Sequence, residues 1–329
     1  MTIHAHFLYE PAEFFHVFTG EEKAQMEGLL DPAVQVTWGQ EAPETAVILI
    51  GGRPSREQLR GPNVRVLIVP WAGLPTQTAD LLAEFPHVAV HNLHHNAAPV
   101  AETAVTLLLA AAKLTIPYDQ ALRRNNWELR YGERRAALLA GKTALILGYG
   151  AIGARVARIC QAMEMRVLAT KRTPPTIQPP EATIYPSANL PHLLPQADAL
   201  IICLPLTTET KGLIGAAELA LLPPGAILVN IGRGPIVDEA ALYEGLRNGR
   251  LYAAGLDVWY NYPPDETSRA QTAPANFPFH ELDNVVLSPH RGGLTLDTER
   301  LRLAHLAELL NQAARGEAMG NRVDLGRGY

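Results

Sequence analysis

The chain has 329 residues, of which 47% are hydrophobic and 19% charged, with a formal net charge of −5. This length suffices for two globular domains, and the composition excludes a disordered or fibrous chain. The densest basic runs, residues 123–124 and 130–135, are short and mixed with Glu and Asn, so we do not expect nucleic-acid binding.

The sequence shows none of the usual features of an exported, membrane-bound or disulfide-linked protein. It contains no apolar run long enough to span a bilayer, and its first segment, MTIHAHFLYE, lacks the basic flank, apolar core and cleavage site of a signal peptide. Its two cysteines, Cys160 and Cys203, suggest neither a metal site nor a disulfide framework, and we expect both to be buried as small hydrophobes. We therefore expect a cytoplasmic protein without a bound metal or a membrane partner.

Apolar runs alternate with helical patterns along the chain, which predicts an α/β protein with parallel sheets covered by helices on both faces. Short apolar runs bounded by Gly and Pro predict the first strands, at 46–50, 64–69 and 88–91. A helix that is apolar on most sides is predicted to open near Pro99, and such a helix could bridge two domains.

A second α/β series begins at Thr143. The last predicted helix, from about Asp297 to Arg315, has leucines at helical spacing, and the proline-rich segments 173–180 and 262–278 predict surface loops. The predicted strands of this series lie at 144–147, 167–169, 199–203, 227–230, 253–257 and 285–287.

Residues 145–156 show the pattern of a strand, a Gly-x-Gly-x-x-Gly turn and the start of a helix. Gly148 permits the tight turn, Gly150 lets the backbone approach a pyrophosphate, and Gly153 lets the helix pack on the strand. The helix N-terminus would supply free N–H groups and the positive end of its dipole. This context predicts dinucleotide binding by Gly148, Tyr149, Gly150, Ala151, Ile152 and Gly153.

The end of the next strand indicates which dinucleotide is bound. An acidic residue about 20 positions after the glycine motif would bind the ribose 2′-hydroxyl of NAD. The sequence there is Thr170-Lys171-Arg172-Thr173, with two cations and two hydroxyls instead of an acid. These residues suit the 2′-phosphate of NADP, so we expect NADP, with NAD as the alternative.

Several further segments resemble one enzyme family in sequence and in order. They begin with Asn96-Ala97-Ala98-Pro99-Val100-Ala101-Glu102 and Leu204-Pro205-Leu206-Thr207. They continue with 230–242 (NIGRGPIVDEAAL), 254–258 (AGLDV) and Ser288-Pro289-His290. With the glycine loop, this series resembles the D-isomer-specific 2-hydroxyacid dehydrogenases over most of the chain.

The resemblance implies a fold of two α/β domains. Residues 1–98 and 296–329 would form a smaller, flavodoxin-like substrate-binding domain, to which the C-terminal helix returns. Residues 99–295 would form a doubly wound, Rossmann-type NAD(P)-binding domain. A homodimer is also implied, with residues 125–135 as a candidate subunit contact.

The resemblance also implies roles for individual residues. Arg233 would bind the substrate carboxylate and polarise the 2-oxo group, because its planar guanidinium pairs bidentately with a carboxylate. His290 would be the acid/base, with an unperturbed pKa of about 6.5 that suits proton transfer. Asp257 would contact the nicotinamide or its ribose.

Other implied roles concern binding alone. Backbone N–H groups of Ala72, Gly73 and Leu74 would receive the substrate carboxylate, with Asn96 nearby. His94 and His95 precede Asn96 and either line the cleft or are plain loop residues. The remaining cofactor contacts would come from Lys171, Arg172, Leu204, Pro205, Thr210, Ile231, Gly232, Arg233, His290 and Gly292.

The sequence departs from the family pattern at Tyr262. The family usually has a Glu five residues after the Asp257 position, and this Glu pairs with the catalytic His. Tyr262 is neutral and offers only a hydrogen bond, so His290 would lose a partner that raises its pKa. The alternative is that Asp265, Glu266 or Glu281 folds back and supplies the missing carboxylate.

Three functions are compatible with these residues. The leading one is hydride transfer between NAD(P)H and a small 2-oxo or 2-hydroxy carboxylic acid, of the glyoxylate/hydroxypyruvate type. The missing Glu suggests oxidation of a small anion such as formate as a second possibility. A non-catalytic, NAD(P)-sensing protein that resembles the corepressors of the family is the third, although such a sensor would need neither Arg233 nor His290.

Overall fold

The computed structural model describes residues 2–9 and 20–326 and divides the chain into two compact units. The first unit comprises Met1–Asn96 and Leu294–Tyr329, and the second Ala97–Gly293. Within the described ranges no single helix is long and apolar enough to cross a membrane. The bent pair Ala97–Lys113 and Thr115–Arg123 passes that test by length and composition, but the longer helix of the pair is buried in the second unit.

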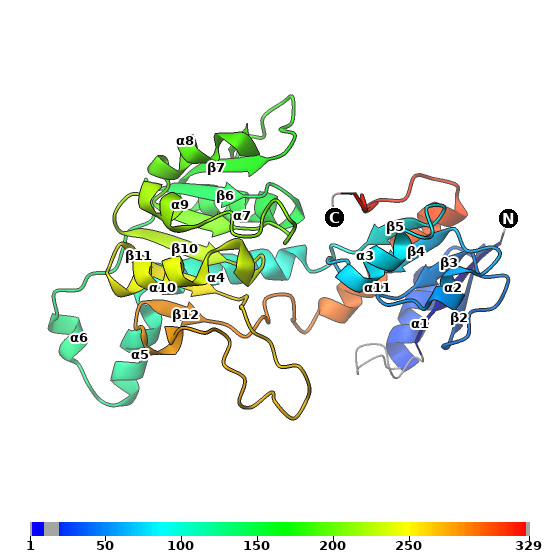
Figure 1. Ribbon diagram of the computed structural model, residues 1–329, viewed down its shortest axis with the longest axis horizontal. Coiled ribbons are helices and arrows are strands. Elements are labelled where there is room, and N and C mark those ends of the chain that lie inside the picture. Colours follow the sequence, from blue (N-terminus) through cyan, green and yellow to red (C-terminus); the bar gives the residue numbers. More distant parts are fainter. Residues whose placement is uncertain (1, 10–19, 327–329) are drawn as a thin grey trace. The chain divides into compact units, whose positions relative to one another are not determined.

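The first unit is built on a five-stranded parallel sheet in the order β2-β1-β3-β4-β5, which is the flavodoxin-like order (Figure 1). Helices α1 and α11 pack on one face around Met26 and Leu306, and α2 and α3 pack on the other around Leu59 and Leu82. The strands are β1 (Ile3–Phe7), β2 (Val34–Trp38), β3 (Ile48–Ile50), β4 (Val66–Val69) and β5 (Ala89–Asn92). The helices are α1 (Gly20–Leu29), α2 (Arg56–Leu59), α3 (Thr76–Leu82) and α11 (Thr298–Ala314).

The second unit is a seven-stranded parallel sheet in the order β12-β11-β10-β9-β6-β7-β8. This is a doubly wound Rossmann-type order, with its reversal between β6 and β9. The strands are β6 (Thr143–Leu147), β7 (Arg166–Lys171), β8 (Thr183–Pro186), β9 (Ala199–Ile202), β10 (Ala226–Asn230), β11 (Leu251–Leu256) and β12 (Val285–Leu287).

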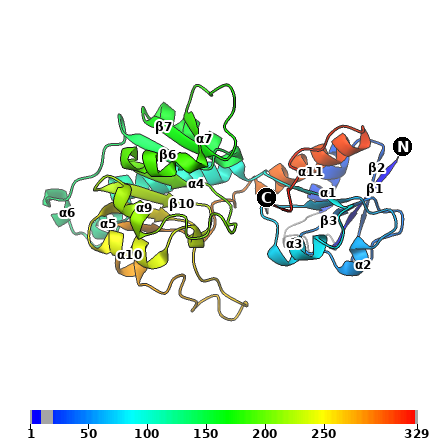
Figure 2. The same cartoon turned by 45° about the horizontal axis from the view of Figure 1, so that its top comes forward.

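Helices cover both faces of this second sheet. One face carries α4 and α7 in a core that contains Leu108 and Val156, and the other carries α8, α9 and α10 in a core that contains Leu219 and Leu246. Figures 1 and 2 both show α6 and the loop of residues 262–278 standing away from this sheet. The helices are α4 (Ala97–Lys113), α5 (Thr115–Arg123), α6 (Glu128–Tyr131), α7 (Ala151–Ala162), α8 (Leu190–Leu193), α9 (Ala216–Leu221) and α10 (Glu239–Arg247). Short 3-10 turns are η1 (Ser187–Asn189), η2 (Leu194–Gln196), η3 (Gly234–Ile236) and η4 (Phe279–Glu281).

The predicted fold class is confirmed, and the predicted strands appear within a few residues of their expected bounds. Three strands were not predicted. β1 was missed because His4 and His6 interrupt its apolar pattern. Both imidazoles are nevertheless buried, and each is hydrogen-bonded to the hydroxyl of Thr37. β2 is half-exposed and β8 is a short edge strand, so neither carries a run of buried apolar residues.

The unit boundaries lie at Asn96/Ala97 and Gly293/Leu294, beside the predicted 98/99 and 295/296. Helix α4 begins at Ala97, so Pro99 lies in its first turn, where a missing N–H costs no helical hydrogen bond. Residues 173–180 and 262–278 lie outside regular secondary structure, as predicted.

Candidate active site

The glycine loop between β6 and α7 has the geometry of a phosphate cradle. Gly148 has φ +96°, and a Cβ on Gly153 would lie 2.0 Å from the carbonyl oxygen of Gly148, so both positions require glycine. A Cβ on Gly150 would meet nothing within 4 Å, so the loop faces open space there. No side chain caps the N-terminus of α7, which leaves its first N–H groups for a ligand. These residues fit a dinucleotide pyrophosphate.

The end of β7 presents two cations beside this loop. The carbonyl oxygen of Thr170 accepts the N–H groups of Gly148 and Tyr149, at 3.2 and 2.9 Å. Lys171 and Arg172 are exposed, whereas the side chain of Thr170 is buried. The exposed groups at this strand end are therefore the two cations, while Thr170 holds the loop through its carbonyl oxygen.

Two carboxylates that sequence reasoning missed lie around this loop. Glu209 pairs with Arg172 at 2.6 Å, and Glu181 accepts a hydrogen bond from the hydroxyl of Tyr149 at 2.5 Å. Burial and this bond raise the pKa of Tyr149 to about 12. Neither acid could be found from the sequence, because each is far along the chain from the residue it contacts.

The segment after β10 holds Arg233 between two glycines that no other residue could replace. A Cβ on Gly232 would lie 2.5 Å from the carbonyl oxygen of Leu204, and one on Gly234 would lie 2.4 Å from that of Trp259. Asn230 braces the segment, since its amide donates to the carbonyl of Arg233 at 3.0 Å and accepts from the N–H of Gly232 at 3.0 Å. The backbone is thus fixed while the Arg233 side chain is exposed.

Asp257, at the end of β11, organises the segment that carries His290. Its carboxylate accepts the hydroxyl of Ser288 and the N–H groups of Arg291 and Gly292, the last two at 3.0 Å. Asp257 is only 2% exposed, and all the hydrogen bonds that its carboxylate accepts in this structure come from this segment of the protein. In this structure Asp257 is a positioning residue, and its contact with nicotinamide remains a prediction.

His290 contacts Tyr262 at the same edge of the sheet and lies within the electrostatic influence of Arg233. Its φ of +56° is unusual for a residue other than glycine, and such strain persists where the surroundings impose it. Its Nδ1 lies 2.9 Å from the hydroxyl of Tyr262. Burial lowers the pKa of His290, the positive charge of Arg233 lowers it further, and Asp257 raises it.

Tyr262 is also bonded to the backbone beside it, since its oxygen accepts the N–H of Trp259 at 3.1 Å. A phenol can donate to Nδ1 of His290 or accept from an Nδ1–H, so this contact is compatible with both neutral tautomers of the ring. A carboxylate at this position would only accept, and would favour the tautomer with the proton on Nδ1.

The acids that could replace the missing Glu are engaged elsewhere. Asp265 accepts from Thr267 and Ser268, Glu266 pairs with Arg269 at 2.7 Å, and Glu281 lies 4.0 Å from His280. The partner of His290 in this structure is therefore Tyr262.

The first unit contains the other residues that the sequence singled out. The segment Ala72, Gly73 and Leu74 is half-buried, and Asn92 donates to the carbonyl of Ala72 at 2.7 Å. Asn96 is half-buried directly before α4. Substrate binding by these residues remains a prediction.

His95 is a core residue of the first unit. It accepts a hydrogen bond from Nε of Arg302 at 3.3 Å, and burial, followed by that cation, lowers its pKa to about 3. Its Nδ1 is buried without a hydrogen-bond partner among the described residues. His94 is half-buried, and burial lowers its pKa as well.

The two cysteines differ in their burial. Cys160 is buried, which raises the pKa of its thiol to about 12, whereas Cys203 is partly exposed and not fully buried as expected. In the part of the chain that the structure describes, no group of three or more His, Cys, Asp or Glu side chains could hold a metal ion.

The functional segments of the second unit share one edge of its sheet. The glycine loop follows β6, Lys171 ends β7, Leu204 follows β9, Arg233 follows β10, and His290 follows β12. All neighbouring strands are parallel, so these segments meet at the carboxyl edge, where doubly wound sheets bind ligands.

Comparison with known proteins agrees with this arrangement. Residues 105–292 match the model of the D-isomer specific 2-hydroxyacid dehydrogenase NAD-binding domain. Glyoxylate/hydroxypyruvate reductase B of Pectobacterium atrosepticum is 33% identical over 310 residues, covering 93% of this chain and 92% of that protein.

Two other known proteins are similar over different shares of their length. D-3-phosphoglycerate dehydrogenase of Archaeoglobus fulgidus is 34% identical over 262 residues, covering 78% of this chain and 47% of that protein, so the chain spans about half the length of this relative. The structure of a D-isomer specific 2-hydroxyacid dehydrogenase from Xanthobacter autotrophicus Py2, in complex with NADPH and MES, aligns with a TM-score of 0.79 at 26% identity and full coverage of both chains. The chain belongs to the D-isomer specific 2-hydroxyacid dehydrogenase family.

Proposed function

We propose that this protein reduces a small 2-oxo carboxylic acid, of the glyoxylate or hydroxypyruvate type, to its 2-hydroxy acid with NADPH. The observation that carries this proposal is the meeting of Arg233, His290 and the glycine loop at one carboxyl edge of the second sheet. The printed name of the Pectobacterium relative supports the substrate class, and the NADPH bound to the Xanthobacter protein supports the cofactor.

The chain's own residues supply binding and proton transfer, and a bound nicotinamide supplies the hydride. Arg233 holds the substrate carboxylate through its guanidinium, which stays charged at any relevant pH. His290 points its Nε2–H at the 2-oxo group, and in its doubly protonated form it delivers a proton to the oxygen as hydride reaches the carbon. Asp257 keeps the His290 segment in place through its three hydrogen bonds.

His290 can serve both directions of the reaction. Reduction begins from imidazolium, in which both nitrogens carry protons, and oxidation begins from neutral imidazole with Nε2 free to accept the hydroxyl proton. The presence of both Arg233 and His290 also argues for chemistry and against a pure cofactor sensor, which needs neither side chain.

The direct test is an assay of NADPH and NADH oxidation with glyoxylate, hydroxypyruvate, pyruvate and phenylpyruvate, with formate tested in the oxidative direction. We expect turnover with at least one of glyoxylate and hydroxypyruvate, and none with formate. Tight cofactor binding without turnover of any 2-oxo acid would refute the enzymatic proposal and favour the sensor.

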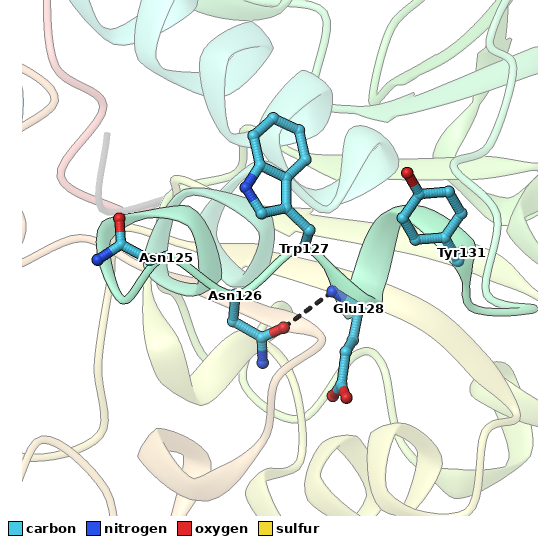
Figure 3. Close-up of a pocket in the computed structure, with 5 residues that line it drawn as sticks. All are labelled: Asn125, Asn126, Trp127, Glu128 and Tyr131. Carbon is cyan, nitrogen blue, oxygen red and sulfur yellow. Dashed lines mark hydrogen bonds between the residues drawn. The ribbon is translucent and has the colours of Figure 1, made fainter.

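We also propose that the protein acts as a cytoplasmic homodimer, with α5–α6 as the subunit contact. Trp127 and Tyr131 are 60% and 78% exposed, and large exposed aromatic side chains mark contact sites. Figure 3 shows them around a surface pocket together with Asn125, Asn126 and Glu128, where Asn126 accepts the N–H of Glu128 at 2.8 Å.

Light scattering after gel filtration tests the assembly. Trp127→Glu should convert the dimer into a monomer, while the control Leu296→Glu, at a fully exposed apolar residue of the first unit, should leave the mass unchanged. A monomeric wild-type protein would contradict the proposal.

A further inference from the structure

The ion pair between Arg172 and Glu209 joins the ends of two strands on either side of the glycine loop. Arg172 follows β7 and Glu209 lies in the segment after β9, while β6, with the loop at its end, lies between these strands in the sheet. The pair therefore crosses the edge where the adenosine half of a dinucleotide binds in a doubly wound sheet. The Arg172 side chain is 37% exposed and that of Glu209 is 71% exposed.

The segment that carries Glu209 is held in a fixed turn. The hydroxyl of Thr210 donates to the carbonyl of Pro205 at 2.7 Å and accepts the N–H of Thr207 at 2.8 Å. The hydroxyl of Thr207 accepts the N–H of Thr210 at 3.2 Å, and the N–H of Lys211 bonds to the Thr207 carbonyl at 3.0 Å. These four contacts between Pro205 and Lys211 hold the backbone that presents the carboxylate of Glu209 to Arg172.

We propose that Glu209 sets the choice between NADPH and NADH by exchanging partners with Arg172. This inference rests on the proposed function, because it assumes that the β7 end receives the adenosine ribose. With NADPH, the 2′-phosphate takes over Arg172, and the displaced carboxylate remains as a repulsive neighbour. With NADH, Glu209 accepts the ribose 2′-hydroxyl, so it supplies from β9 the carboxylate that β7 lacks.

Glu209 and a 2′-phosphate would compete for the same cation. One Nη of Arg172 donates to the Glu209 carboxylate at 2.6 Å, and a phosphate that pairs bidentately with the guanidinium would have to take over that donor. A carboxylate is also the group that binds a ribose 2′-hydroxyl in NAD-dependent proteins. Glu209 therefore weakens NADPH binding and strengthens NADH binding, and the protein uses both cofactors with a moderated preference for NADPH.

The test measures binding by calorimetry, independent of turnover. In Glu209→Gln, we expect NADPH and adenosine 2′,5′-bisphosphate to bind about 3–10-fold more tightly, in line with the free energy of an exposed ion pair and the removal of a repulsive charge. NADH and 5′-AMP should bind about 2–5-fold more weakly, since an amide accepts the hydroxyl less strongly than a carboxylate. Tighter binding of NADPH together with weaker binding of NADH is the result that supports the partner exchange.

Two controls isolate the exchange. Glu244→Gln removes the partner of Arg247 on α10, an exposed pair with the same 2.6 Å distance, and should change neither affinity. In an Arg172→Ala background, Glu209→Gln should no longer tighten adenosine 2′,5′-bisphosphate by more than about twofold, because no guanidinium remains to be released.

If Glu209→Gln changed the affinities for NADPH and NADH equally, or changed neither, the role of Glu209 would be overturned. Adenosine 2′,5′-bisphosphate and 5′-AMP carry no nicotinamide, so that result would be independent of whether any 2-oxo acid is reduced. Conversely, opposite shifts without turnover of any acid would uphold this inference and refute the proposed reaction.

Discussion

The hydroxyl of Tyr262 lies 2.9 Å from Nδ1 of His290, at the position where the family pattern places a carboxylate. A neutral partner cannot stabilise imidazolium as a carboxylate does, and both burial and Arg233 lower the pKa of His290 further. The proposed acid/base therefore has a lower pKa than a histidine paired with Glu would have, and it is protonated over a narrower pH range.

This relationship predicts the pH profile of reduction. Reduction needs protonated His290, so its rate should fall as pH rises through a pKa below the ordinary value of about 6.5. Tyr262→Glu should move that alkaline limb upward by about one unit or more, because the new carboxylate stabilises the imidazolium. The measurement is kcat/KM against pH for both proteins, because this ratio reports the pKa of His290 in the substrate-free protein.

The control for this substitution is Tyr262→Phe, which removes the hydrogen bond without adding charge. It should lower kcat and leave the alkaline limb below that of Tyr262→Glu. If the three profiles coincide, His290 is not the group that titrates.

Arg233→Ala and His290→Ala should both abolish most activity but should differ in kind. Loss of Arg233 should raise KM for the 2-oxo acid and lower kcat, because it removes the partner of the carboxylate. Loss of His290 should act mainly on kcat, by about 10²–10⁴-fold, as expected for a general acid/base. Steady-state kinetics distinguish these patterns, and near-normal kcat in His290→Ala would place the acid elsewhere.

The cations at the end of β7 predict a preference for NADPH over NADH of about tenfold or more, since a charge-assisted contact to phosphate contributes about 1.5–3 kcal/mol. Lys171→Ala and Arg172→Ala should each raise KM for NADPH far more than KM for NADH. Equal or better use of NADH by the wild-type protein would contradict the assignment.

Two glycines of the phosphate loop should respond differently to the same substitution. Gly150→Ala places a methyl group in open space, so Tm should stay near that of the wild type while cofactor affinity falls. Gly153→Ala forces a carbon to within 2.0 Å of the Gly148 carbonyl oxygen, so the strand–helix turn must shift and Tm should fall. Thermal unfolding and cofactor titration measure both effects, and an unchanged affinity in Gly150→Ala would show that the ligand does not approach there.

Most of the fold was predictable because parallel strands that helices cover on both faces appear in the sequence as short, continuous apolar runs. The strands at 144–147, 227–230 and 285–287 were found this way and appear as β6, β10 and β12. The same approach failed for β1, where His4 and His6 are buried by hydrogen bonds to Thr37. Hydrophobic periodicity assigns such imidazoles to the surface, because it contains no information on the distant hydroxyl group that forms their hydrogen bonds.

The sequence by itself determined the α/β class and the glycine loop, because local spacing fixes which residues end each strand. Its resemblance to the family singled out Arg233, Tyr262 and His290. Only the tertiary structure decided their partners. It paired Tyr262 with His290, placed Asp257 under the His290 segment, and brought Glu209 to Arg172 across the edge of the sheet. These contacts join residues 28 or more positions apart, and a hydrogen bond between distant residues depends on strand order and loop path, which no local pattern encodes.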